Sequence, residues 1–135
     1  MSSLTGNERI LVIEDETSIL ELSTRILTRS GYRVTAVLDG MEAWEVFHAD
    51  PDAFDLLFVD VMLPRLSGLR FGRRVRMLRP ALPILYTSGF APHGLPPDQS
   101  EDPWTAFVAK PYGPEALLRH LRSLLDRKRA AGAEA

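Results

Sequence analysis

Residues 56–64 read LLFVDVMLP, and this stretch indicates both the class of fold and a candidate reactive group. The run at 55–59 is apolar at consecutive positions, which is typical of a central strand in a parallel sheet that is covered on both faces. Asp60 follows directly, and Pro64 comes four positions later. A carboxylate at the end of such a strand is either an ordinary exposed loop residue or a charged group on a rigid support, and the rest of the chain decides between the two.

Short apolar runs alternate with longer amphipathic segments along the whole chain. This alternation indicates strands joined by crossover helices, and therefore an α/β fold with a parallel sheet between two layers of helices. Because crossovers are right-handed, few arrangements remain, and we predict a doubly wound five-stranded sheet with strand order 2-1-3-4-5. The predicted strands are 9–13, 32–37, 55–59, 83–87 and 105–109, and the predicted helices are 17–30, 40–49, 67–79 and 113–129.

Three residues mark the ends of the predicted helices. Gly31 is placed to end the first helix in a left-handed conformation, and Asp39 is placed to cap the second. Pro114 suits the first turn of the last helix, where its missing N–H is not needed.

Residues at helical spacing predict the apolar stripe of each helix. In chain order, the stripes are Ile19, Leu22 and Ile26; Ala43, Val46 and Phe47; Phe71, Val75 and Leu78; and Leu117, Leu121, Leu124 and Leu125. The remaining faces of the third helix carry arginines, which we interpret as a solvated surface, with contact to an acidic partner as the alternative: Arg70, Arg73, Arg74, Arg76 and Arg79.

Residues 90–103 interrupt the alternation, because four prolines and a glycine stand where a fourth long helix is expected. Each internal proline costs a helix about 3 kcal/mol. We therefore predict an irregular segment here, with at most a turn or two of helix.

The composition is that of one globular domain, with 135 residues of which 45% are hydrophobic and 25% charged. We predict a domain over residues 8–129 with flexible termini at 1–7 and 130–135. The absence of cysteine excludes disulfides, zinc–thiolate sites and cysteine nucleophiles. A net charge of −2 gives no overall attraction to nucleic acid or acidic lipid, and no segment has the apolar length of a signal peptide or a membrane span. We expect a soluble cytoplasmic protein with no DNA-binding domain.

Polar residues follow the predicted strands at the edge where their carboxyl ends meet. In an open parallel sheet this edge is where ligands bind, near the point at which the strand order reverses. Any one of these residues alone is an ordinary loop residue, so the prediction depends on their joint occurrence. They are Glu14, Asp15 and Glu16 after the first strand, Asp60 after the third, Thr87 and Ser88 at the end of the fourth, and Lys110 after the fifth.

Converging carboxylates favour a hard divalent cation, and Mg²⁺ needs only one or two of them because it keeps several waters. We predict Asp15 and Asp60 as direct ligands, Glu14 as a ligand directly or through water, and the backbone carbonyl of Met62 as a further oxygen donor. No cofactor other than Mg²⁺ is expected.

Asp60 lies at the centre of this group and is the candidate nucleophile toward a phosphoryl group. Phosphoryl transfer develops negative charge on the equatorial oxygens, which Mg²⁺, the Lys110 ammonium and the Ser88 hydroxyl can share. A carboxylate is ionised at neutral pH, so no general base is required.

Four motifs in this order and spacing resemble the receiver domains of bacterial two-component response regulators, over about residues 8–127. The resemblance implies a flavodoxin-like sheet, which agrees with the predicted strand order. The second predicted helix also begins in a way that is similar to this family. The motifs are ILVIEDE at 10–16, DVMLPRLSG at 60–68, ILYTSG at 84–89 and VAKPY at 108–112, with LDGMEAW at 38–44 beside the second helix.

The resemblance implies a role for each site residue. Asp60 matches the phospho-acceptor, which takes its phosphoryl group from a histidine kinase or a histidine phosphotransfer protein. Glu14 and Asp15 match the acidic pair for Mg²⁺, Ser88 matches the Ser/Thr position, and Lys110 matches the family's lysine. The peptide bond that follows this lysine is commonly cis in the family.

Phe107 occupies the family's switch-aromatic position, and Ser88 is the other switch residue. Phosphate is expected to draw Ser88 inward, so that Phe107 follows into the vacated space. The sequence departs from the family at Glu14, where aspartate is commoner, at Phe107, which lacks a tyrosine hydroxyl, and at 90–103. Dimerisation through the usual fourth-helix face is therefore not expected.

We interpret the chain as a response regulator that is phosphorylated on Asp60, switches a protein-interaction surface, and catalyses only its own phosphorylation and dephosphorylation. A reordering of residues 88–107 is the expected change. The alternatives are a receiver cut from a hybrid kinase, a phosphate sink, a receiver-like module that does not turn over phosphate, and an Asp-nucleophile phosphatase. The phosphatase is disfavoured because Met62 stands where that chemistry usually has a second acid.

Overall fold

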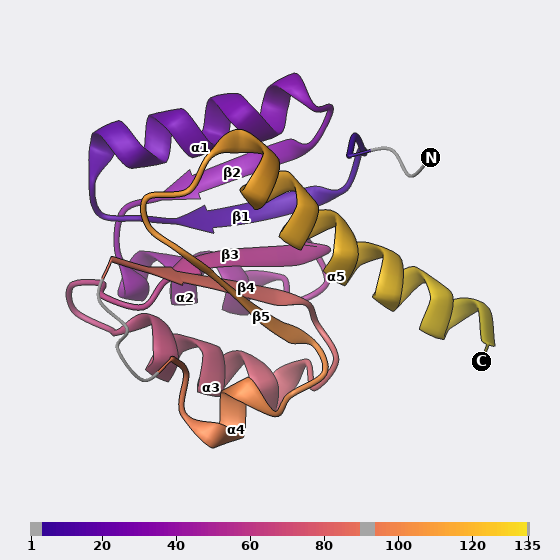
Figure 1. Cartoon of the computed structure of the whole chain (residues 1–135). Coiled ribbons are helices and arrows are strands. Elements are labelled where there is room, and N and C mark those ends of the chain that lie inside the picture. The colour runs from indigo at the N-terminus through magenta and orange to yellow at the C-terminus, as the bar shows by residue number, and fades with distance from the viewer. Residues whose placement is uncertain (1–3, 90–93, 135) are drawn as a thin grey trace.

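The computed structural model describes residues 4–89 and 94–134, and it has the predicted sheet. Within these residues, five parallel strands form one sheet with the order β2-β1-β3-β4-β5 (Figure 1). The strands are β1 (Arg9–Ile13), β2 (Arg33–Val37), β3 (Leu56–Asp60), β4 (Ile84–Ser88) and β5 (Thr105–Ala109). The order reverses between β1 and β3, so the ligand-binding edge is expected at their carboxyl ends.

Helices cover both faces of the sheet and divide the core into two layers. Apolar residues of α1 and α5 pack on one face, and those of α2 and α3 pack on the other (Figure 1). The helices are α1 (Thr17–Arg29), α2 (Gly40–Ala49), α3 (Gly68–Leu78), α4 (Pro97–Ser100) and α5 (Pro114–Glu134). Among the helices of the described residues, none combines the length and hydropathy needed to span a membrane.

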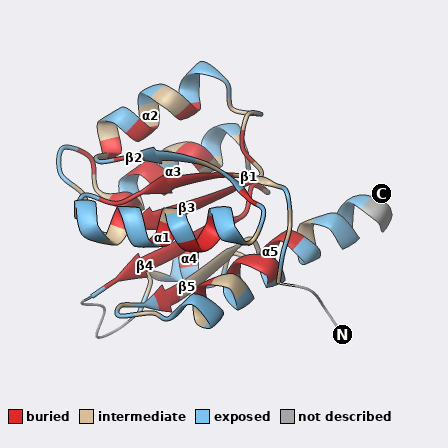
Figure 2. Ribbon diagram, turned by 90° about the horizontal axis from the view of Figure 1, so that it is seen from above, coloured by how far each residue is buried: buried red, intermediate tan, exposed pale blue. Residues whose placement is uncertain are grey.

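Strand β3 is buried along its whole length, as its apolar run predicts (Figure 2). Phe58 contributes to the core layer under α1 and α5, whereas Val59 contributes to the layer under α2 and α3. Strand β2, at the edge of the sheet, is largely exposed. Because both faces of β3 are covered, the carboxyl end of this strand, which carries Asp60, is held rigidly.

The predicted helix ends are confirmed. Gly31 has φ of 98°, a conformation that glycine adopts without steric cost, and its N–H bonds to the carbonyl of Thr28 at 3.0 Å. The Asp39 side chain accepts a hydrogen bond from the N–H of Glu42 at 2.7 Å, and α5 begins at Pro114. The segment before β5 holds only the one-turn helix α4, as predicted, although residues 90–93 lie outside the described residues.

Two residues of the predicted apolar stripes are exposed instead. Leu22 is 48% exposed and Leu78 is 45% exposed. The stripe of α1 that faces the sheet is rotated from the predicted one, and Leu78 is the last residue of α3, where the helix leaves the core. The buried residues of α1 are Leu20, Ser23, Ile26 and Leu27.

Helix α5 is longer than predicted, because residues expected in the flexible tail are helical as far as Glu134. The turn just before this extension contacts the connection between α4 and β5. The guanidinium of Arg127 donates to the carbonyl of Pro103, and the Lys128 ammonium lies 5.2 Å from the centroid of the Trp104 ring. Such tertiary contacts stabilise a helix end that composition alone would leave frayed.

The arginines of α3 are not the simple solvated surface that the sequence predicts. Arg73 pairs with Asp98, and Arg76 pairs with Asp102, so both link α3 to the segment around α4. The guanidinium of Arg76 also donates to the carbonyl of Leu82 at 2.6 Å. It makes further hydrogen bonds to the Arg79 and Trp104 carbonyls and to the Thr105 hydroxyl. Arg76 therefore joins α3, the start of β4 and the start of β5.

We expect Arg76→Ala to lower the free energy of unfolding by about 2 kcal/mol, because it leaves a largely buried carboxylate and several carbonyls without their donor. Arg73→Ala is the matched control. It removes an ion pair in which both side chains are about half exposed, and should cost about 0.5 kcal/mol. Urea denaturation measures both. Equal losses in the two variants would show that Arg76 does not hold this region together.

Candidate functional site

Charged residues from three strands meet at the carboxyl edge of the sheet. Glu14 follows β1, Asp60 ends β3 and Lys110 follows β5. The Lys110 ammonium lies 2.6 Å from Glu14 Oε1 and 2.5 Å from Asp60 Oδ2, and both carboxylates are buried. Asp15 is exposed, and one oxygen from each of Asp15, Glu14 and Asp60 lies within 4.8 Å of the others. The structure therefore brings the predicted acids and the predicted lysine together.

Backbone amides fix the orientation of the two buried carboxylates. The N–H of Met62 donates to Asp60 Oδ1 at 2.8 Å, while the Met62 side chain is exposed. The N–H of Glu16 donates to Glu14 Oε2 at 3.1 Å. In each case the chain turns directly after the strand, so that an amide two residues later reaches the carboxylate. The remaining oxygens, Asp60 Oδ2 and Glu14 Oε1, face Lys110.

Gly68 allows α3 to begin directly against the end of β3. A Cβ atom at this position would lie 2.1 Å from the carbonyl oxygen of Asp60, which no real side chain tolerates. The N–H of Gly68 bonds to the carbonyl of Val61 at 2.9 Å. The Ser-Gly pair at 67–68 therefore has two roles. Gly68 permits the close approach to the end of β3, and the Ser67 side chain caps α3 by accepting a hydrogen bond from the N–H of Arg70.

An ion pair that the sequence analysis missed holds the loop between β3 and α3. Arg65 Nη2 lies 3.0 and 2.9 Å from the two carboxylate oxygens of Asp39. Arg65 has φ of 66°, in the left-handed region, and Asp39 also caps α2. The partners are far apart in the sequence, and neither belongs to a pattern that signals pairing.

Two buried carboxylates share a single ammonium here, and this affects the protonation of Glu14. Burial raises the pKa of Glu14 to about 7, and the neighbouring Asp60 adds to the shift while Lys110 opposes it. Burial by itself would lower the pKa of Lys110, but its contacts with Asp60 and Glu14 outweigh that effect and raise the pKa. The site is thus short of positive charge at neutral pH.

This shift predicts how stability depends on pH in the absence of divalent cations. The pKa of Glu14 is about 7 in the folded chain and ordinarily 4.5, so the stabilising contribution of this carboxyl group is present below pH 4.5 and is lost as the pH rises through about 7. Glu14→Gln should flatten this dependence. Relative to wild type, its free energy of unfolding should improve by about 2 kcal/mol between pH 5 and pH 8.

Urea denaturation in EDTA across this range measures the effect, and Glu115→Gln on the exposed side of α5 is the control. If the Glu14→Gln and wild-type profiles stay parallel, Glu14 does not carry a raised pKa.

The predicted switch residues lie on the other face of the same edge. Ser88 ends β4 and is buried, and its carbonyl accepts from the N–H of Lys110 at 3.0 Å. Phe107 is half-buried and pairs in register with Tyr86, two residues before Ser88, so it lies diagonally beside Ser88. The Lys110–Pro111 peptide bond is cis, as the resemblance implies.

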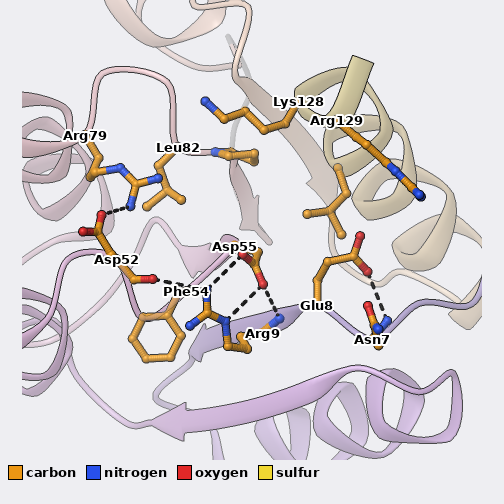
Figure 3. A pocket seen from close by; sticks show the side chains of 12 residues that line it. Asn7, Glu8, Arg9, Asp52, Phe54, Asp55, Arg79, Leu82, Lys128 and Arg129 are labelled. Atoms are coloured by element: carbon orange, nitrogen blue, oxygen red, sulfur yellow. Dashed lines mark hydrogen bonds and ion pairs between the residues drawn. The ribbon is translucent and has the colours of Figure 1, made fainter. Parts of the chain in front are cut away.

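A second charged cluster lies at the opposite edge of the sheet, around the amino ends of β1 and β4 (Figure 3). Its pocket has a volume of about 570 Å³. Two of its cations already face acids, since Arg9 pairs with Asp55 and Arg79 pairs with Asp52. These pairs connect loops, and they are separated from the acidic site by the length of the strands.

The geometry of the acidic edge agrees with the comparisons to known proteins. The model of the response regulator receiver domain matches residues 10–122. The chain belongs to this family. A receiver protein of Brucella abortus, CpdR, is 31% identical over 119 residues, which are 88% of this chain and 92% of CpdR.

Other relatives of this receiver are longer proteins. MprA, a response regulator of Mycobacterium ulcerans, is 37% identical over 94% of the chain, which spans 54% of MprA. The sensor kinase CckA of Brucella abortus is 25% identical, and the chain spans 13% of it. The receiver therefore matches a domain that occurs both alone and within larger signalling proteins.

Solved receiver structures share the fold. A response regulator receiver protein of Sinorhizobium medicae has a TM-score of 0.77 at 28% identity, covering 89% of this chain and 95% of that one. The chemotaxis protein CheY4 of Vibrio cholerae has a TM-score of 0.74 at 27% identity, covering 88% and 99%. The chain is thus a response regulator receiver domain of two-component signalling, with a CheY-like fold.

Proposed function

We propose that this receiver accepts a phosphoryl group on Asp60 from a histidine kinase or a histidine phosphotransfer protein. The observation that carries the proposal is the position of the Lys110 ammonium, 2.5 Å from Asp60 Oδ2 and 2.6 Å from Glu14 Oε1. A buried carboxylate held between an ammonium and a backbone amide, beside further acids, is suited to receive an anionic group.

The residues present fit Mg²⁺. Their donors are carboxylate oxygens, which Mg²⁺ prefers, and two buried acids share one ammonium, so a divalent cation would relieve a shortage of positive charge. Asp15 and Asp60 would bind it directly, Glu14 directly or through water, and the Met62 carbonyl would complete the protein ligands. When bound, Mg²⁺ supplies charge to phosphoryl oxygens during transfer.

Each side chain of the site has a separate role in phosphoryl transfer. One carboxylate oxygen of Asp60 attacks phosphorus, a P–O bond forms, and the bond from phosphorus to the donor breaks. The amide of Met62 orients the Asp60 carboxylate, which needs no general base. Lys110 and Ser88 neutralise charge on the transferring oxygens. The receiver thus catalyses the phosphorylation of its own Asp60 and the hydrolysis of the resulting acyl phosphate, and it acts on no other substrate.

The proposed output is a change in a protein-interaction surface. Ser88 moving toward a phosphoryl oxygen would vacate space on the face where Phe107 is only half-buried, beside the short α4. Backbone amides of residues 94–107 should then change their hydrogen-exchange rates when Mg²⁺ and beryllofluoride are added. Unchanged rates across this segment would exclude this route of signalling.

Incubation with acetyl phosphate tests the proposed function. With Mg²⁺, the wild-type protein should gain the mass of one phosphoryl group, as measured by intact mass spectrometry. With EDTA in place of Mg²⁺, incorporation should fall to a small fraction of that level, because the buried acids then repel the phosphoryl donor. Equal labelling with and without Mg²⁺ would contradict the metal requirement, and no labelling would contradict the function.

A further inference from the structure

Thr87, near the end of β4, carries a hydroxyl that the proposed chemistry does not use. The residue is 2% exposed, and its Oγ1 atom is buried without a hydrogen-bond partner. A buried hydroxyl without a partner is destabilising, and a valine of the same shape would avoid that penalty. The position of Thr87 suggests which donor forms a hydrogen bond with this hydroxyl.

The strand register places Thr87 on the same face of the sheet as the acidic site. Thr87 pairs with Asp60 across β3 and β4, and paired residues of parallel strands point to the same side. Phe58 and Leu85, two residues before each of them, belong to the core layer under α1 and α5. Thr87 and Asp60 therefore share the face that α1 and α5 cover.

Lys110 must cross strand β4, which carries Thr87, to reach Asp60. Lys110 follows β5, Asp60 ends β3, and β4 lies between these strands. Val108, two residues before Lys110, pairs with Thr87 and lies in the core layer under α1 and α5. Two strand spacings, roughly 10 Å, separate β5 from β3, so the lysine side chain extends across β4 on the face that also carries Thr87.

We propose that the Thr87 hydroxyl becomes a partner of Lys110 in the phosphorylated receiver. It would accept a hydrogen bond from the Lys110 ammonium once Asp60 carries the phosphoryl group. The ammonium has three N–H donors, and its present contacts are to Asp60 Oδ2 and Glu14 Oε1. Phosphorylation converts Asp60 to an acyl phosphate and Mg²⁺ attracts Glu14, so one N–H of the ammonium moves to a phosphoryl oxygen and another is left for a second acceptor on the same face. Thr87 is thus a positioning residue for Lys110, an inference that rests on the proposed function.

Beryllofluoride with saturating Mg²⁺ probes this state, and isothermal titration calorimetry measures its affinity. Thr87→Val should bind about tenfold more weakly than wild type, because a hydrogen bond to a charged group is lost. In EDTA the same variant should melt about 3 °C higher, because the unpaired hydroxyl is gone. Thr87→Ser keeps the hydroxyl, so its affinity should stay near that of wild type although it loses a methyl group.

Thr24→Val is the matched control, since Thr24 Oγ1 on α1 is also buried without a partner. Its affinity for beryllofluoride should equal that of wild type. The inference is overturned if Thr87→Val binds as wild type does, if Thr87→Ser weakens binding as much as Thr87→Val, or if Thr87→Val melts lower in EDTA. If the wild type binds beryllofluoride in these cases, the proposed function still holds. If the wild type does not bind beryllofluoride, both the proposed function and the inference about Thr87 are overturned.

Discussion

Asp60→Asn is expected to abolish the Mg²⁺-dependent incorporation of phosphate from acetyl phosphate. An amide carries no negative charge, so it is a far weaker nucleophile than a carboxylate and a weaker ligand for Mg²⁺. The fold should survive, because asparagine has the same shape and its side-chain oxygen can still accept from the N–H of Met62. Intact mass spectrometry after the same incubation measures the loss.

Asp52→Asn is the control for this prediction. Asp52 lies at the opposite edge of the sheet, its side chain is 86% exposed, and it pairs with Arg79. This variant should label as wild type does. Labelling of Asp60→Asn at the wild-type level would place the acceptor elsewhere, with Asp15 the first residue to examine.

Lys110→Met is expected to cause the largest loss of stability at the site. The Lys110 side chain is 13% exposed and the two carboxylates it contacts are 4% exposed, so the variant leaves buried acids without their cation. Removing one partner from such a cluster costs about 3 kcal/mol. Methionine keeps most of the side-chain packing, so the loss reports the charge. Urea denaturation at pH 8 in EDTA measures it.

Two conditions should restore the stability of Lys110→Met. Added Mg²⁺ supplies positive charge to the same acids, and a fall to pH 5 protonates Glu14, whose pKa burial already raises. Lys128→Met removes an ammonium that lies over the Trp104 ring, at the other edge of the sheet, and its stability should respond to neither condition. Failure of Mg²⁺ to restore Lys110→Met would contradict a shared cation site.

The sheet could be predicted from the sequence because its signals are local. Consecutive apolar residues mark β3 as central, and a parallel sheet brings the carboxyl ends of its strands to one edge whatever the details of packing. Asp60, Glu14 and Lys110 could therefore be expected to meet before any distance was known. The helix ends at Gly31 and Asp39 were predictable for the same reason, since a single residue determines each.

Features that depend on how distant segments approach one another were not predictable. Arg76 is one of four arginines on α3, and only the tertiary structure sets it between Asp102 and the Leu82 carbonyl. The Arg65–Asp39 pair depends on the path of a loop, and the exposure of Leu22 depends on the rotation of α1. Periodicity gives the face of a helix to within about one residue, which is too coarse to resolve such contacts.

A crystal structure with Mg²⁺ and beryllofluoride tests the central claim most directly. It should show beryllium on a carboxylate oxygen of Asp60 and one Mg²⁺ bound by Asp15, Asp60 and the Met62 carbonyl. The Lys110 ammonium should contact a fluoride. Beryllium on any other residue, or Mg²⁺ bound away from Asp15 and Asp60, would contradict the account.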